Sequence, residues 1–278
     1  MSDHCDIYAV IGNPVAHSKS PEIHAAFAQQ TSQAVVYKRL FCELSAFNET
    51  VRAFQAQGGK GLNITVPFKH EAFAFATRHS ARATQAGAVN VLAFEPGGVS
   101  GDNTDGAGLV RDITVNLGCA LRGKSVLLLG AGGASFGVVG PLLAEAPRAL
   151  VIANRTVSKA EALAQRFAAS GAVADCKLAA TGYNALTGQP FDVVINATSA
   201  GLSGDMPALP DHLFTADALA YDMVYGKSTP FMQYAQAQGA AVADGLGMLV
   251  EQAAESFLIW RGVRPATAPV MAMLRAQR

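Results

Sequence analysis

Residues 125–135 read SVLLLGAGGAS, and this stretch decides the fold of the chain. The run from Ser125 to Leu129 is short and apolar, as expected of a strand that is buried on both faces of a parallel sheet. The glycine-rich turn GAGG follows at once, and an apolar helical pattern begins after Ser135. This order of strand, turn and helix is typical of a βαβ unit that binds a dinucleotide, because the backbone of the turn can approach a pyrophosphate and the helix N-terminus faces its charge.

The turn departs from the strict dinucleotide pattern at Ser135, where a third glycine is usual, so an ordinary tight connection stays open as an alternative. The residues at the end of the next strand indicate that the turn binds a cofactor. It ends in Asn154, Arg155 and Thr156, where NAD-binding folds usually place a carboxylate on the ribose. Arg155 offers a planar cation for a 2′-phosphate, so we expect NADP(H) rather than NAD. Further donors come from Asn154, Thr156 and Lys159. The alternative is that Arg155 is a solvated residue at a helix start.

The composition describes a large, ordered chain. Its 278 residues are 50% hydrophobic and 15% charged, which is the opposite of a disordered composition and suggests about two domains. Lysines and arginines (21) balance aspartates and glutamates (21), so the chain lacks the positive field that nucleic acids and anionic membranes require. The most apolar region, residues 126–153, is interrupted by glycines, prolines and charges. We therefore expect no nucleic-acid partner and no membrane partner.

The sequence does not indicate export or metal binding. Residues 1–20 lack the order of charged and apolar segments that defines a secretory signal. The four cysteines lie far apart and include no CxxC pair, so we expect neither a zinc site nor a disulfide framework. The expectation is a cytoplasmic protein with reduced thiols and no metal. No coiled-coil heptad is visible, and a monomer and a homodimer both stay open.

Apolar runs of strand length alternate with helical patterns, which predicts the α/β class with mostly parallel sheets. We expect an N-terminal α/β domain over residues 1–105; its role in binding substrate and in catalysis follows from its polar residues and from a family resemblance. A Rossmann-like, doubly wound domain is expected over residues 106–245 to bind NADP. Residues 246–278 are helical without strands, and we expect them to pack back on the first domain. The expected strands are residues 7–11, 35–44, 61–66, 89–94, 99–101, 125–129, 149–153, 191–195, 218–223 and 240–243.

Polar side chains recur among the predicted strands and loops of the first domain. Ser18 and Ser20 stand at a predicted helix start, where their hydroxyls and nearby N–H groups could receive a carboxylate. Alternatively, Ser20 simply caps the helix. Asn63 and Thr65 alternate with apolar neighbours, which predicts that both face one side of a strand and need polar partners such as the hydroxyls of a polyol.

Two charged residues complete this set. Lys69 follows the strand closely, and Asp105 lies in the loop GDNTDG at the expected domain boundary. Taken alone, Lys69 could be an ordinary exposed lysine and Asp105 a helix cap. Together with the polar residues and the dinucleotide turn, they predict a site for a small hydroxylated acid.

The same residues carry a family resemblance that covers nearly the whole chain. In chain order, the sequence contains the strings YAVIGNPVAHSKSP, NITVPFKH, GAVN, GDNTDG, GAGGAS, NRT, NATS, DMVY and DGLGMLVEQA. In this combination and order, the chain resembles the shikimate dehydrogenase family. The resemblance implies an enzyme that reversibly reduces 3-dehydroshikimate to shikimate with NADPH, in the biosynthesis of chorismate and aromatic amino acids.

The resemblance also implies roles for individual residues. Lys69 and Asp105 would form the catalytic pair, and Ser18 and Ser20 would bind the substrate carboxylate. The residues implied around the ring hydroxyls are Asn63, Thr65, Asn90, Tyr225 and Gln252. The positions implied to hold NADP are Gly130, Ala131, Gly132, Gly133, Ala134, Asn154, Arg155, Thr156, Lys159, Met223 and Gly245. Phe136 departs from the family, in which a basic or small residue is more frequent after the glycine turn.

Three other functions stay open. A quinate or dual quinate/shikimate dehydrogenase would share the fold and the catalytic pair. Against it, the serine pair fits shikimate better than a threonine-bearing variant does, and Arg155 without an acidic neighbour disfavours NAD. A non-catalytic NADP sensor would have no physical need for both Lys69 and Asp105. A folate-linked methylene dehydrogenase would give the pair Ser18 and Ser20 no carboxylate to bind.

Overall fold

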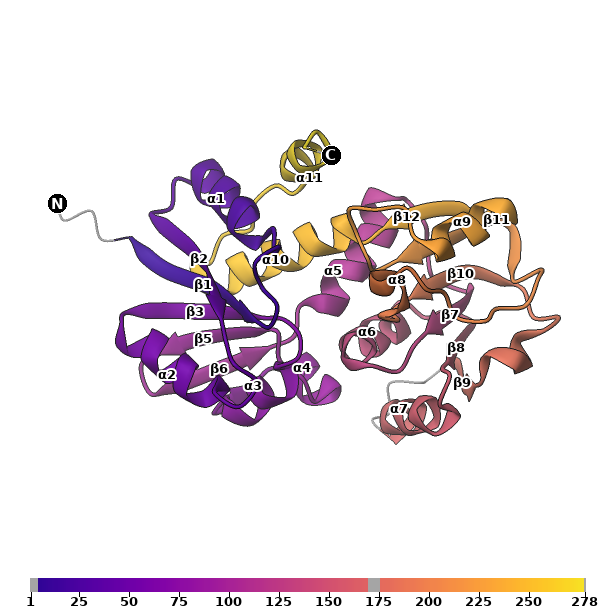
Figure 1. Cartoon of the computed structure of the whole chain (residues 1–278), viewed down its shortest axis with the longest axis horizontal. Coiled ribbons are helices and arrows are strands. Elements are labelled where there is room, and N and C mark those ends of the chain that lie inside the picture. Colours follow the sequence, from indigo (N-terminus) through magenta and orange to yellow (C-terminus); the bar gives the residue numbers. More distant parts are fainter. Residues whose placement is uncertain (1–4, 170–175, 278) are drawn as a thin grey trace. The chain divides into compact units, whose positions relative to one another are not determined.

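The structure is a computed structural model that describes residues 5–169 and 176–277. Its helices and strands form two compact units (Figure 1). Unit 1 comprises Met1–Gly108 and Val250–Arg278, and unit 2 comprises Leu109–Leu249. The C-terminal helices thus belong to the same unit as the N-terminal residues. Within the described ranges, no helix is long and apolar enough to cross a membrane.

Unit 1 contains a mixed six-stranded sheet in the order β2-β1-β3-β5-β6-β4. β1 pairs in parallel with β2 and β3, whereas β5 and β6 form an antiparallel hairpin next to β3. Gly97 and Gly98 have positive φ in the turn of this hairpin, as a tight EPGG turn requires. The strands are β1 (Asp6–Gly12), β2 (Val35–Phe41), β3 (Gly59–Ile64), β4 (Arg78–His79), β5 (Val91–Glu95) and β6 (Gly98–Asp102).

Helices cover both faces of this sheet. On one face, Ala9 and Ile11 of β1 share a core cluster with Phe47 and Val51 of α2. On the opposite face, the ring of Tyr8 stacks on Trp260 of α10, as the alternation of side chains along a strand requires. The helices are α1 (Ser20–Thr31), α2 (Phe47–Ala56), α3 (Lys69–Phe75), α4 (Ala81–Ala86), α10 (Leu246–Arg261, in unit 1 from Val250 onward) and α11 (Ala268–Arg275).

Unit 2 contains an all-parallel sheet in the order β12-β11-β10-β7-β8-β9. Read from β9, this is the 3-2-1-4-5-6 order of a doubly wound dinucleotide-binding sheet, which confirms the predicted fold class. The strand order reverses between β7 and β10, and ligands bind at this point in such sheets. The strands are β7 (Ser125–Leu129), β8 (Ala149–Ala153), β9 (Lys177–Thr181), β10 (Phe191–Asn196), β11 (Phe214–Asp222) and β12 (Ala241–Asp244).

The central strand β7 is buried on both faces, as its unbroken apolar sequence predicted. Val126 and Leu128 join one core cluster with Val138 of α6, and Leu127 joins another with Phe231 of α9. Two-sided burial explains why this strand is the clearest signal in the sequence. The helical elements from α5 to α9 are α5 (Asp105–Arg111), the π-helix Asp112–Asn116, α6 (Gly133–Ala144), α7 (Val157–Ala169), the short helix Tyr183–Leu186, α8 (Ala200–Ser203) and α9 (Pro230–Ala237).

The structure corrects several details of the sequence interpretation. β3 ends at Ile64, so Thr65 lies in the following loop and does not share a strand face with Asn63. α1 begins at Ser20 and its N-cap position is Lys19, so Ser20 is not the helix cap. The strand predicted to reach residue 44 ends at Phe41, and the residues of the expected domain boundary at Asp105 begin a helix. The short edge strands β4 and β9 were missed because neither presents a run of buried apolar residues.

Candidate active site

Lys69 and Asp105 form an ion pair within unit 1. Each is the first residue of a helix, Lys69 in α3 and Asp105 in α5. Their side chains are 17% and 9% exposed, so the pair is largely shielded from water. An ammonium has three N–H donors and Asp105 takes one of them, so Lys69 keeps the capacity to donate to an oxygen of a ligand.

Asn90 orients the Asp105 carboxylate. Its Nδ2 donates to Asp105 Oδ1 at 2.8 Å, while Lys69 uses the other oxygen, Oδ2. Asn90 is itself fixed, because its Oδ1 accepts the backbone N–H of Thr104 at 2.8 Å. The side chain is 2% exposed, so these bonds form in an environment where water does not compete. The predicted residues Lys69, Asn90 and Asp105 therefore form one hydrogen-bonded cluster.

Helix α10 adds polar side chains to this hydrogen-bonded cluster. Gln252 and Ser256 are four residues apart, which places them on the same helix face. Gln252 Oε1 lies 3.4 Å from Asn90 Nδ2, and Ser256 Oγ accepts a hydrogen bond of 2.8 Å from Asn63 Nδ2. Thr104 Oγ1 lies 3.4 Å from both Gln252 and Ser256. Sequence reasoning missed Thr104 and Ser256, although the first lies in the quoted loop GDNTDG and the second one turn after Gln252.

The two predicted carboxylate-binding serines lie at the start of α1. Ser18 Oγ donates to Ser20 Oγ at 3.2 Å, and Ser20 N donates to Ser18 Oγ at 3.3 Å. Tyr37 of β2 donates to Asn63 Oδ1 at 2.7 Å. Burial of its hydroxyl raises the pKa of Tyr37 well above its usual value, and a hydrogen bond with Ser20 opposes this increase. Tyr37 therefore connects the serine pair with Asn63, and nothing in the local sequence signals this role.

Unit 1 thus joins most of the predicted substrate residues in one polar network. Thr65 lies in the loop after β3, where its N–H donates to the Ile11 carbonyl at 3.0 Å. Tyr225 belongs to unit 2 and follows β11. The network members predicted from the sequence are Ser18, Ser20, Asn63, Lys69, Asn90, Asp105 and Gln252.

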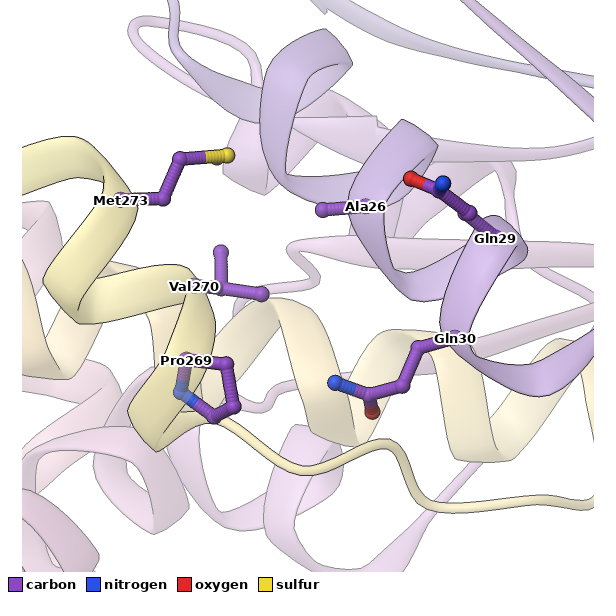
Figure 2. A pocket seen from close by; sticks show the side chains of 6 residues that line it. All are labelled: Ala26, Gln29, Gln30, Pro269, Val270 and Met273. Atoms are coloured by element: carbon purple, nitrogen blue, oxygen red, sulfur yellow. The ribbon is translucent and has the colours of Figure 1, made fainter.

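A separate pocket of about 380 Å³ lies between α1 and α11 (Figure 2). No charged side chain lines it, and none of its residues belongs to the polar network. We therefore do not assign the active site to this pocket. Its lining residues are Ala26, Gln29, Gln30, Pro269, Val270 and Met273.

The glycine turn of unit 2 is open where a phosphate would approach. A Cβ added at Gly132 or Gly133 would meet no atom within 4 Å. Gly130 differs, because its φ is +106° and an added Cβ would lie 3.2 Å from the Ala197 carbonyl group. Ser135, at the departure from the strict pattern, is fully buried and donates to the Gly130 carbonyl at 2.9 Å. Its hydroxyl therefore stabilises the turn without filling it, and the residues present fit a dinucleotide pyrophosphate.

The other predicted cofactor residues follow neighbouring strands. Asn154 Nδ2 donates to the Thr156 carbonyl at 2.9 Å and shapes the turn after β8, on which Arg155, Thr156 and Lys159 are exposed. These side chains are accessible to a ligand. Phe136 is half-buried and packs against the core of unit 2, so the ring at this unusual position has a structural role.

Met223 and Gly245 meet at the ends of β11 and β12. A Cβ on Gly245 would lie 2.2 Å from the Met223 carbonyl oxygen, so only glycine permits this approach. The turn that carries Met223 and Tyr225 is held by Asp222, whose Oδ1 accepts the Val224 N–H at 3.0 Å. Asp222 is fully buried, and the sequence pattern did not predict a role for it.

Neutral donors compensate the burial of this carboxylate. Asp222 Oδ2 accepts hydrogen bonds from Asn196 Nδ2 at 3.2 Å and from Thr229 Oγ1 at 2.6 Å. Asn196 Oδ1 in turn accepts from Thr198 Oγ1 at 2.7 Å, next to the Gly130 turn. Asn196 and Thr198 belong to the string NATS, and Asp222 belongs to the string DMVY. These two strings are the sequence signal that could have identified the three residues.

A parallel sheet in the dinucleotide-binding order, an open glycine turn and a shielded Lys–Asp pair define a nicotinamide-dependent dehydrogenase. Family models match three segments of the chain: residues 10–92 match the shikimate dehydrogenase substrate binding domain, residues 113–203 match shikimate / quinate 5-dehydrogenase, and residues 245–275 match the shikimate 5′-dehydrogenase C-terminal domain. The chain belongs to the shikimate dehydrogenase family.

Individual relatives are similar over almost their full length. Shikimate dehydrogenase (NADP(+)) of Alkalilimnicola ehrlichii is 61% identical over 98% of this chain and 99% of the relative. The crystal structure of an Ael1 enzyme from Pseudomonas putida is 50% identical, with a TM-score of 0.91 over 97% of this chain and 98% of that one. Shikimate 5-dehydrogenase from Thermus thermophilus, in complex with NADP(H) and shikimate, is 31% identical, with a TM-score of 0.85 over 98% and 99% of the two chains.

Proposed function

We propose that this chain is an NADP-dependent shikimate dehydrogenase that reversibly reduces 3-dehydroshikimate to shikimate. The observation that carries the proposal is the network around Lys69, Asp105 and Asn90, which ends in the serine pair Ser18 and Ser20. Its spacing of a cation, amides and hydroxyls suits a small ring that bears a carboxylate, a carbonyl and hydroxyls. The named activities of the relatives support the same substrate and cofactor.

The substrate residues divide into two groups in this proposal. Ser18 and Ser20 bind the carboxylate, exchanging their mutual hydrogen bond for bonds to the anion. The ring hydroxyls are bound by amide, hydroxyl and phenol groups, which donate or accept as each hydroxyl requires. The residues of this second group are Asn63, Thr65, Asn90, Tyr225 and Gln252.

NADPH, when bound, supplies the hydride that reduces the substrate ketone. Lys69 donates a hydrogen bond to the carbonyl oxygen and stabilises the negative charge that develops on it. Asp105 holds the ammonium in place, and Asn90 keeps Asp105 in the orientation that does so. The Lys69 ammonium is also placed to donate the proton that converts this oxygen into the hydroxyl of shikimate, and proton delivery by such a positioned group contributes about 10² to 10⁴ in rate.

The cofactor is held by unit 2 in this proposal. Gly130, Ala131, Gly132, Gly133 and Ala134 form the pyrophosphate turn at the N-terminus of α6. Charge-assisted hydrogen bonds from Arg155 to the 2′-phosphate select NADP over NAD, with support from Asn154, Thr156 and Lys159. Met223 and Gly245 contribute the close backbone approach at the ends of β11 and β12.

The domain roles and the cellular setting complete the proposal. Residues 1–105 with the helices of 246–278 bind substrate, and residues 106–245 bind NADP. The enzyme acts in the cytoplasm, as a monomer or a homodimer, in the biosynthesis of chorismate and aromatic amino acids. All four cysteines lie in the described part of the chain and are unpaired, which suits a reducing compartment.

The decisive assay follows NADPH formation by absorbance with shikimate and NADP, with parallel reactions that contain quinate or NAD. We expect fast turnover only with shikimate and NADP. Comparable turnover with quinate or NAD would keep the fold and the catalytic pair but contradict the specificity. Absence of turnover in every reaction would contradict the proposed enzyme and favour a non-catalytic NADP-binding protein.

A further inference from the structure

Two side chains of β2 reach the substrate site, although no step of the proposed function uses them. Tyr37 and Arg39 are two residues apart and therefore point to the same face of the strand. Lys38, between them, points to the opposite face. β2 is the edge strand of the first sheet and pairs with β1, whose following loop leads to Ser18 and Ser20.

Arg39 holds the backbone of the serine pair. Its Nε and Nη2 donate to the Ser18 carbonyl oxygen at 3.0 and 2.6 Å. Nη2 also donates to both carboxylate oxygens of Glu22, at 3.0 and 2.9 Å. An exposed Arg–Glu pair contributes little to stability, but the planar guanidinium can bind two acceptors in fixed directions, which lysine cannot do. The geometry therefore indicates orientation of Ser18 rather than stabilisation of the fold.

Tyr37 fixes the direction of the Asn63 amide. Its hydroxyl donates to Asn63 Oδ1 at 2.7 Å, and Asn63 Nδ2 donates to Ser256 Oγ at 2.8 Å. Nδ2 also lies 3.4 Å from the Asn90 carbonyl. Both amide hydrogens of Asn63 thus have partners, so what remains is acceptor capacity on Oδ1, and the buried His24 side chain is a further neighbour of this amide. Asn63 is consequently set to accept a hydrogen bond from a ligand hydroxyl.

The phenol ring of Tyr37 is held from one side by His24. The two rings stack with centroids 4.2 Å apart and an interplanar angle of 3°. His24 is fully buried, so the stack is part of the packed interior between α1 and β2. Removing only the hydroxyl of Tyr37 would therefore leave its ring in place, and a phenylalanine variant tests the hydrogen bonds of the hydroxyl, to Asn63 and with Ser20.

We propose that Arg39 and Tyr37 are positioning residues of the substrate site, Arg39 for the serine pair and Tyr37 for Asn63. Arg39 holds the Ser18 peptide so that the two serine hydroxyls, 3.2 Å apart, can turn toward one carboxylate. Tyr37 gives Asn63 its role as an acceptor for a ring hydroxyl. This inference rests on the proposed function, because it assigns the two groups to the carboxylate and the hydroxyls of shikimate.

The test for Arg39 compares a substrate that carries the carboxylate with one in which the carboxylate is replaced by an uncharged ester. kcat and KM are measured for shikimate and for its methyl ester in the wild type, Arg39→Gln, Arg39→Lys and the matched control Lys38→Gln. We expect Arg39→Gln to raise the KM for shikimate about tenfold with kcat changed less than about threefold, since the lost orientation weakens charge-assisted bonds. The KM for the ester should change much less. Lys38→Gln removes the same charge from the other face of β2 and should behave as the wild type.

Arg39→Lys separates orientation from charge. Because lysine keeps the charge but not the planar fork, we expect it to resemble Arg39→Gln. A wild-type KM for Arg39→Lys would show that only the charge matters and would overturn the positioning role. Equal losses for acid and ester would also overturn it, because the effect would then not act through the serine pair.

The test for Tyr37 uses Tyr37→Phe with the same two substrates. We expect the KM to rise about fivefold or more for the ester and at least as much for the acid, because the lost hydroxyl bonds to Asn63 and also interacts with Ser20 of the serine pair. The melting temperature should stay close to that of the wild type. Unchanged kinetics would overturn the role of Tyr37. An inactive wild type would contradict the proposed function and this inference together, whereas an active wild type with unaffected variants would contradict this inference alone.

Discussion

Asn90 Nδ2 lies 2.8 Å from Asp105 Oδ1 and donates to the carboxylate oxygen that Lys69 does not use. The two oxygens of Asp105 are thus divided between an amide and an ammonium. Each bond limits rotation of the carboxylate, and both partners are buried or nearly so. The ammonium of Lys69 is therefore held in a fixed position rather than on a mobile side chain, which a residue that assists proton transfer requires.

Replacement of Lys69 by alanine should lower the catalytic rate much more than the affinity for substrate. We expect kcat for shikimate oxidation to fall by about 10² to 10⁴, the usual range for a lost general acid or base. The KM for shikimate should change only a few fold, because the serine pair and the amides that we propose as its binding groups stay in place. Steady-state kinetics measure both constants. Lys60→Ala, at an exposed position on β3, is the control, and near-normal turnover of Lys69→Ala would contradict the assignment.

A substitution at Gly132 should weaken cofactor binding without changing the stability of the protein. A Cβ at this position meets no protein atom within 4 Å, so Gly132→Ala should fold normally and keep the wild-type melting temperature within about 2 °C. The new methyl group would nevertheless stand in the open turn where the pyrophosphate approaches the backbone. We expect calorimetric titration to show NADP bound about tenfold more weakly or worse. Unchanged affinity would show that the pyrophosphate does not bind at this turn.

Gly130→Ala is the matched comparison for Gly132→Ala. Its φ of +106° and the Ala197 carbonyl group 3.2 Å away leave no unstrained place for a side chain. We therefore expect a lower melting temperature for this variant, in contrast to Gly132→Ala. Similar behaviour of the two variants would contradict the distinction drawn from the structure.

Arg155 should determine the choice between NADP and NAD. Arg155→Gln removes the cation proposed for the 2′-phosphate, and a charge-assisted hydrogen bond is worth about 1.5 to 3 kcal/mol. We expect kcat/KM for NADP to fall about 10- to 100-fold, while the value for NAD changes little. The control is Arg166→Gln, which removes an arginine near the opposite end of α7. A parallel loss with both cofactors would instead indicate a structural role for Arg155.

The sequence predicts best what is local along the chain. The strand, glycine turn and helix around Gly130 are neighbours in sequence, so their pattern predicted a dinucleotide-binding βαβ unit, and the strands that recur after it predicted the doubly wound sheet. The Lys69 and Asp105 pair came from a family resemblance, because no rule of spacing joins positions so far apart. Asp222 was not assigned a role from the sequence, because its hydrogen-bond donors also lie on other elements of the fold. A buried carboxylate at a strand end has no signature until its donors from other strands and helices are known.

The contribution of β2 shows the same limit more sharply. Arg39 and Tyr37 act on residues 21 and 26 positions away in the chain, through the parallel pairing of β1 and β2. That pairing sets the register and decides which side chains share a face. A strand with alternating polar and apolar residues reveals the existence of a polar face but not its partner. The sequence therefore pointed to the residues that we propose to bind substrate, but not to the side chains of β2 that contact them.

His24 should make the stability of the protein depend on pH. The imidazole is fully buried in an aromatic cluster that includes Tyr37, and an interaction with the Asn63 side chain opposes the effect of burial on its pKa only in part. Burial lowers the pKa of His24 from 6.5 to about 3. The unfolded chain therefore takes up a proton as the pH falls below about 6.5, whereas the folded chain does not until about pH 3. In this window the free energy of unfolding should fall with decreasing pH, and above it His24 contributes no pH dependence.

His24→Phe tests this dependence, because it keeps a stacked ring and removes the titratable group. The slope due to His24 approaches about 1.4 kcal/mol per pH unit at its steepest, and urea unfolding at several values between about pH 5 and pH 8 measures it. We expect the variant to lose less stability than the wild type on going from neutral to acidic pH. His17→Gln, at an exposed position, should retain the wild-type profile. Parallel profiles for His24→Phe and the wild type would mean that the His24 imidazole takes up its proton equally well in the folded chain, and the acid sensitivity would then have to come from other groups.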